Sequence, residues 1–102
     1  MVSKNTYWKV IKIMKLEPKQ QLMVILSEEC GELIQICQKI LRRGCVDLDN
    51  KDEDYYIKFV EELGDVYTMI NLMHEWDIVS WDDLEKRAEY KLEKLKKWSD
   101  LV

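Results

Sequence analysis

The sequence contains few residues that break helices, since its 102 residues include three glycines and one proline. It also lacks any segment in which apolar and polar residues alternate for long, the pattern that is typical of a half-buried strand. Apolar residues instead recur at steps of three and four along most of the chain, which is the spacing of one helix face. The sequence therefore predicts an all-α protein. Its length predicts one domain over residues 1–102.

Long apolar runs are absent as well. The longest runs, such as residues 22–26, are far too short for a membrane-spanning helix or a signal peptide. The three cysteines include no CxxC pair, and Cys30 and Cys37 would lie about 10 Å apart along one helix, which is beyond the reach of a disulfide. We therefore expect reduced thiols and a cytoplasmic location, with neither a membrane nor a nucleic acid as a partner.

Start and stop signals divide the chain into four predicted helices. Gly44 follows two arginines and predicts a helix end. Asn50 with Glu53 resembles a capping box, and Ser80 with Asp83 repeats that start signal. The predicted helices span about residues 3–15, 18–43, 51–76 and 81–98. Four helices with short connections predict a four-helix bundle, and a chain this small gains stability from oligomerisation.

Two short acidic strings repeat one pattern. EECGE at residues 28–32 and EELGD at residues 61–65 each contain two adjacent glutamates, a spacer, a glycine and a third carboxylate. Each string interrupts an apolar row that lies beside the predicted core row of its helix. The first core row is Leu22, Leu26, Cys30, Leu33, Cys37 and Leu41, and the row beside it is Ile25, Glu29, Glu32, Ile36 and Ile40. The second core row is Phe59, Leu63, Val66, Ile70 and Met73, and the row beside it is Glu62, Asp65, Met69, Leu72 and Trp76.

Four carboxylates that face one another inside a helix pair need positive charge between them. An ionised carboxylate without a partner in a buried site costs several kcal/mol or takes up a proton. Ligation by oxygen alone favours a hard divalent ion, Mg²⁺ or Mn²⁺, over zinc. The predicted metal ligands are Glu29, Glu32, Glu62 and Asp65.

Gly31 and Gly64 occupy matching places in the two strings. Each costs about 1 kcal/mol relative to alanine in a helix interior. We therefore expect a compensating role, which is close approach of the two helix backbones beside the ion. The alternative interpretation treats the glycines as incidental, and treats Glu28 and Glu61 as solvated surface acids.

The two strings resemble the EExxE and ExxD motifs of the MazG-like all-alpha nucleoside triphosphate pyrophosphohydrolases, which are related to the dimeric dUTPases and the dCTP pyrophosphatases. The resemblance covers about residues 20–98, and the long interval between the motifs, residues 33–61, predicts a longer connecting loop. It implies Mg²⁺-dependent hydrolysis of a (deoxy)nucleoside triphosphate between the alpha and beta phosphates, with Mn²⁺ as a substitute ion. It also implies a homodimer or homotetramer in which another subunit completes the pocket.

The resemblance assigns roles to further residues. Basic residues of the last helix bind the phosphates in such enzymes, which implies this role for Lys91, Lys94 and Arg87. Glu28 is the candidate catalytic residue, either as general base or as ligand of a second ion, and Glu61 is a weaker candidate. The alternative for the basic helix is a solvated amphipathic surface on which acids pair with neighbouring lysines.

Two other functional classes compete with the enzyme. A di-iron carboxylate bundle also uses paired helical glutamates, but it needs a histidine three residues after a glutamate, which neither string has. A non-catalytic helical-bundle interaction module accounts for the apolar rows but not for the matched acids. The sequence leaves open which aromatic ring would stack on a base. We expect a structural or surface role for His74, the one histidine.

Overall fold

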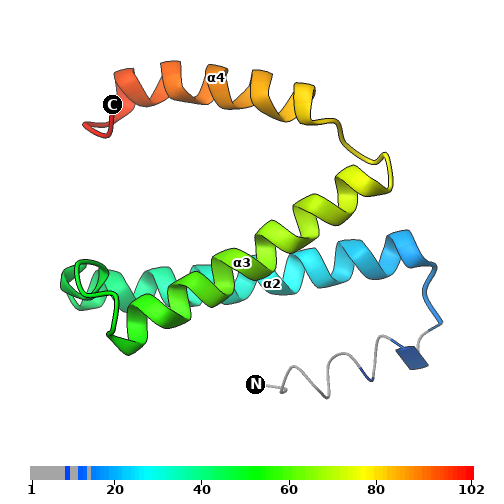
Figure 1. Cartoon of the computed structure of the whole chain (residues 1–102), viewed down its shortest axis with the longest axis horizontal. Coiled ribbons are helices and arrows are strands. Elements are labelled where there is room, and N and C mark those ends of the chain that lie inside the picture. Colours follow the sequence, from blue (N-terminus) through cyan, green and yellow to red (C-terminus); the bar gives the residue numbers. More distant parts are fainter. Residues whose placement is uncertain (1–8, 10–11, 14) are drawn as a thin grey trace. The chain divides into compact units, whose positions relative to one another are not determined.

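The computed structural model describes residue 9, residues 12–13 and residues 15–102, and this part of the chain is helical without any strand (Figure 1). It contains α2 (Pro18–Arg42), the 3₁₀ helix η1 (Val46–Leu48), α3 (Asp54–Glu75) and α4 (Trp81–Trp98). The predicted all-α class is therefore confirmed for the described residues. The predicted helix at residues 3–15 falls largely outside them.

The chain divides into two compact units, Met1–Met69 and Ile70–Val102. The first unit contains α2, η1 and the larger part of α3, and the second contains the end of α3 and all of α4. Both acidic strings belong to the first unit, whereas the basic residues of the last helix belong to the second.

Local hydrogen bonds account for the bounds of α2. Pro18 occupies the first turn, where its missing N–H is not needed. The backbone N–H of Glu17 donates to Gln20 Oε1 at 3.0 Å. At the other end Gly44 has φ +72° and Cys45 has φ +64°, and the Cys45 N–H donates to the Ile40 carbonyl oxygen at 3.0 Å. These two left-handed residues end the helix, as the glycine predicts.

The start of α3 differs from the prediction. The helix begins at Asp54 rather than near residue 51, because the Asn50 side chain organises a turn instead of a cap. Asn50 Oδ1 accepts from the Asp52 N–H at 3.1 Å, and Asn50 Nδ2 donates to Glu53 Oε1 at 3.2 Å. Asparagine side chains compete with helices in this way.

Helix α4 begins as predicted. Ser80 Oγ accepts from the Asp83 N–H at 3.1 Å, which caps the helix. The helix ends at Trp98, and none of its residues is buried. Leu84 and Leu95 are half-buried, while Leu92 is exposed. Among the described helices, none combines the length and apolar composition that crossing a membrane requires.

The buried seam between α2 and α3 runs mostly through the rows that contain the acids. Among the described residues, the buried members of these rows are Ile36, Ile40, Met69, Glu29 and Glu62, whereas the buried Leu22 and Met73 belong to the predicted core rows. The predicted core rows are wrong in part, since Cys30 and Leu63 are exposed and Leu41 is 61% exposed. A pair of helices buries one narrow strip of each helix. In this pair the strip runs mostly through the acidic rows.

Candidate metal centre

Three carboxylates meet at the seam of the first unit. Glu29 comes from α2, and Glu62 and Asp65 come from α3, where they are three positions, or nearly one turn, apart. One carboxylate oxygen from each residue lies within 4.8 Å of the oxygens from the other two. Glu29 is 3% exposed and Glu62 is 1% exposed, while Asp65 is half-buried. The structure thus joins three of the four predicted ligands from both strings.

The other acids of the two strings lie around this group. Glu32 follows Glu29 by nearly one turn of α2 and is half-buried, and it does not belong to the three carboxylates that meet. Glu28 is half-buried on α2. The side chain of Glu61 is 59% exposed, so it differs clearly from its neighbour Glu62.

Lys58 supplies a positive charge that the sequence analysis missed. Its Nζ lies 2.9 Å from Glu62 Oε1 and 3.7 Å from Glu61 Oε2. The signal was available, because a lysine four residues before a glutamate lies on the same helix face. Three carboxylates this close together offer a set of oxygen ligands that could hold a divalent cation.

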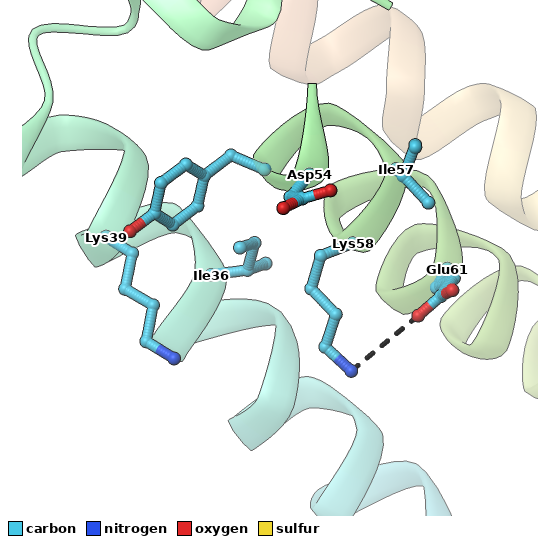
Figure 2. Close-up of a pocket in the computed structure, with 7 residues that line it drawn as sticks. Ile36, Lys39, Asp54, Ile57, Lys58 and Glu61 are labelled. Atoms are coloured by element: carbon cyan, nitrogen blue, oxygen red, sulfur yellow. Dashed lines mark ion pairs between the residues drawn. The ribbon is translucent and has the colours of Figure 1, made fainter. Parts of the chain in front are cut away.

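A pocket of about 380 Å³ lies beside the ion pair of Lys58 and Glu61 (Figure 2). Lys58 and Glu61 line it from α3, and Ile36 and Lys39 line it from α2. Tyr55 adds an aromatic wall, and its ring also lies 5.3 Å from the guanidinium carbon of Arg43. The pocket therefore combines two lysines with one aromatic ring. It adjoins the three carboxylates through Lys58, which pairs with Glu62.

The predicted phosphate-binding residues are exposed on α4. Arg87 and Lys94 both stack on Tyr90, with the guanidinium carbon 4.4 Å and the ammonium nitrogen 5.1 Å from the ring centroid. Lys91 is exposed on the same helix. Acids of this helix also pair with lysines, since Lys96 Nζ lies 2.8 Å from Glu93 Oε1, as expected for a solvated amphipathic surface. Cation–π contacts hold two of the three predicted cations at Tyr90.

The expected role of the glycines is wrong for contacts within the described chain. A Cβ atom added at Gly31 or Gly64 would meet no atom of this part of the protein within 4 Å. Close approach of α2 and α3 therefore does not require either glycine. Both glycines lie on parts of their helices that face open space.

His74 has a structural contact. Its ring stacks on Trp81 with the centroids 4.8 Å apart and an interplanar angle of 30°. This contact joins the last turn of α3 to the first turn of α4. It fits the structural role expected for the histidine.

Comparison with other proteins identifies no relative of this chain. No family model, no curated protein and no solved structure matches this chain.

Proposed function

We propose that this chain is a Mg²⁺-dependent nucleoside triphosphate pyrophosphohydrolase of the MazG-like all-alpha type. It would hydrolyse a (deoxy)nucleoside triphosphate between the alpha and beta phosphates, and would serve to cleanse or control the nucleotide pool. The observation that carries the proposal is the buried group of Glu29, Glu62 and Asp65, with oxygens within 4.8 Å of one another. The motif resemblance and the helical fold support it.

The donor set fits a hard divalent ion. All three side chains offer oxygen, two of them are almost fully buried, and a divalent cation would neutralise their negative charge. Glu32 is the proposed fourth ligand, because its place on α2 follows Glu29 by nearly one turn. Mn²⁺ would substitute for Mg²⁺, since both ions prefer oxygen ligands in octahedral geometry.

Each residue of the proposed site has a distinct task. The bound ion would neutralise phosphate charge and lower the pKa of a bound water. Glu28, half-buried next to the ligands on α2, would accept the proton of the attacking water as general base. Arg87, Lys91 and Lys94 would bind phosphate oxygens, for which guanidinium and ammonium groups are suited.

An oligomer belongs to the same proposal. Four exposed apolar residues of α3 recur at steps of three and four and form one stripe: Ile57, Val60, Leu63 and Tyr67. Continuous apolar stripes of this kind mark protein interfaces. We propose that a second copy covers this stripe in a homodimer, or in a homotetramer built from two such dimers.

A non-catalytic helical interaction module is the second candidate. The exposed stripe on α3 favours it, because an interface of this kind needs no metal. The two candidates differ in what the buried carboxylates do. An interaction module would bind Mn²⁺ no better than an exposed acidic surface does.

Activity measurements test the enzyme directly. The full chain would be incubated with each common and damaged deoxynucleoside triphosphate and Mg²⁺, and pyrophosphate release would be followed. We expect Glu32→Ala and Asp65→Ala to lower kcat by at least about 100-fold, the scale on which loss of catalytic charge stabilisation acts. Glu75→Gln is the control, since this acid of α3 is exposed and belongs to neither acidic string. Full activity of the two alanine variants would refute the assignment.

A further inference from the structure

We propose that Lys58 is a further binding residue of this site, with two alternating partners. Without a divalent ion its ammonium group neutralises Glu62, and with the ion bound it contacts a phosphate oxygen of the substrate. The inference rests on the proposed function, because it takes the metal site as given. It adds a phosphate ligand within the same compact unit as the carboxylates.

The ammonium group of Lys58 lies between the buried carboxylate of Glu62 and the pocket. On one side it approaches Glu62 Oε1 at 2.9 Å, and the Glu62 side chain is 1% exposed. On the other side it lies 3.7 Å from Glu61 Oε2, and the side chains of Lys58 and Glu61 are 51% and 59% exposed. The Lys58 ammonium group therefore pairs with the buried Glu62. It also pairs with Glu61 beside the pocket that both residues line (Figure 2).

The pocket beside Lys58 suits a phosphate that carries its own cation. Lys39 and Lys58 provide two ammonium groups, and the ring of Tyr55 provides an apolar wall. Asp54 and Glu61 line the pocket as well, so that a bare anion would meet repulsion as well as attraction. A polyphosphate in complex with a metal ion carries less negative charge than the bare anion. With its ion held by Glu29, Glu62 and Asp65, it would reach the lysines from the side of these carboxylates.

Binding of the ion would change the partner of Lys58. A divalent ion at Glu29, Glu62 and Asp65 would place two positive charges close to an ammonium group that now pairs with Glu62. The two cations repel each other. Lysine carries its charge on a flexible stem, and Glu61 already attracts that charge toward the pocket. The ammonium group would therefore leave Glu62 and become available to a phosphate oxygen.

Titration calorimetry with the full chain tests both halves of the exchange. Mn²⁺ would be titrated first, and its tripolyphosphate complex, which carries a phosphate chain without a base, would follow. We expect Lys58→Gln to bind Mn²⁺ roughly tenfold more tightly, because a competing cation is gone. The same variant should bind the manganese–tripolyphosphate complex roughly tenfold more weakly, because a charged hydrogen-bond donor is gone.

Two variants control for side effects. Lys86→Gln is the matched control, because Lys86 Nζ lies 2.9 Å from Asp82 Oδ2 in an exposed pair with the same four-residue spacing, and both affinities should stay unchanged. Lys58→Arg keeps the charge and should stay within about threefold of the wild type for Mn²⁺. Circular dichroism would verify that each variant is folded.

The possible results separate the two proposals. If the wild type binds no Mn²⁺, the proposed function fails and this inference fails with it. If the wild type binds Mn²⁺ and releases pyrophosphate but Lys58→Gln does not tighten Mn²⁺ binding, the exchange at Glu62 is overturned alone. Unchanged affinity of Lys58→Gln for the tripolyphosphate complex would overturn the phosphate contact.

Discussion

Charge crowding dominates at the scale of single residues. Glu29, Glu62 and Asp65 lie together at the seam, and carboxylates at such distances repel one another when all are ionised. Lys58 relieves the repulsion at Glu62. The proposed ion would relieve the remaining repulsion among the three carboxylates.

Asp65→Asn tests whether this group binds an ion. Millimolar Mg²⁺ should raise the Tm of the wild type, because an ion that binds only the folded protein stabilises it. The variant should lose most of this rise, because an amide is a poorer ligand than a carboxylate. Thermal melts with and without Mg²⁺ measure the effect.

Asp82→Asn provides the comparison for that variant. Asp82 pairs with Lys86 on the exposed face of α4, where an ion pair contributes about 0.2–1 kcal/mol at most. Its replacement should be neutral or slightly destabilising at every Mg²⁺ concentration. A full rise in Tm with Mg²⁺ in Asp65→Asn would contradict the assignment of Asp65 as a metal ligand.

Sequence patterns predicted three carboxylates that lie close together in the structure, but not the lysine beside them. The paired strings identified Glu29, Glu62 and Asp65, because acids in apolar rows are unusual enough to be noticed. Lys58 escaped notice because lysines four residues from a glutamate are common on solvated helix surfaces. Its importance depends on the burial of Glu62, which a one-dimensional pattern does not give.

At the scale of helices, the sequence predicted where helices end better than it predicted which face of each helix is buried. Gly44 and Ser80 each use backbone chemistry that acts locally, so their signals are readable from a few residues. The buried face was misjudged because adjacent rows of α2 and α3 are both apolar. Which row faces the partner helix depends on packing between segments that are distant in the sequence. Leu41 and Leu63 are exposed for this reason.

Glycine replacements test the helix faces. Gly31→Ala and Gly64→Ala should each raise the free energy of unfolding by up to about 1 kcal/mol, because alanine favours helix and the added Cβ meets open space. Urea denaturation measures the change. Loss of stability in either variant would show that another backbone approaches the glycine in the assembled protein.

Gly44 supplies the opposite case for the same experiment. Its φ of +72° lies in the left-handed region, where an alanine is strained. Gly44→Ala should therefore lower the free energy of unfolding by about 1 kcal/mol. The contrast between the two helical glycines and the one at the helix end separates helix propensity from backbone strain.

At the scale of the whole molecule, exposed apolar surface is the main feature. Ile57, Val60, Leu63 and Tyr67 form a stripe on α3 that the described part of the chain leaves exposed. A single small chain rarely leaves such a stripe in water. We propose that a second copy covers this stripe. The assembly would then contain two clusters of carboxylates, one from each copy.

Val60→Glu tests the assembly. We expect a charge in the middle of the stripe to weaken self-association by at least about tenfold, because an unpaired charge would be buried in the interface. Light scattering after size-exclusion chromatography, repeated over a range of protein concentrations, measures the change. Gln38→Glu adds the same charge at an exposed position of α2 and should leave the mass unchanged. A wild type that stays monomeric at high concentration would contradict the proposal.

The ion pair between Lys58 and Glu62 bears on the order of events during biosynthesis. Since the lysine already lies 2.9 Å from the buried glutamate, a newly made chain can close the seam between α2 and α3 before it encounters any ion. Under the proposed function, maturation would consist of folding first and binding of the ion afterwards. A cell short of magnesium would then accumulate folded but inactive protein, and fresh magnesium would restore its activity without new synthesis.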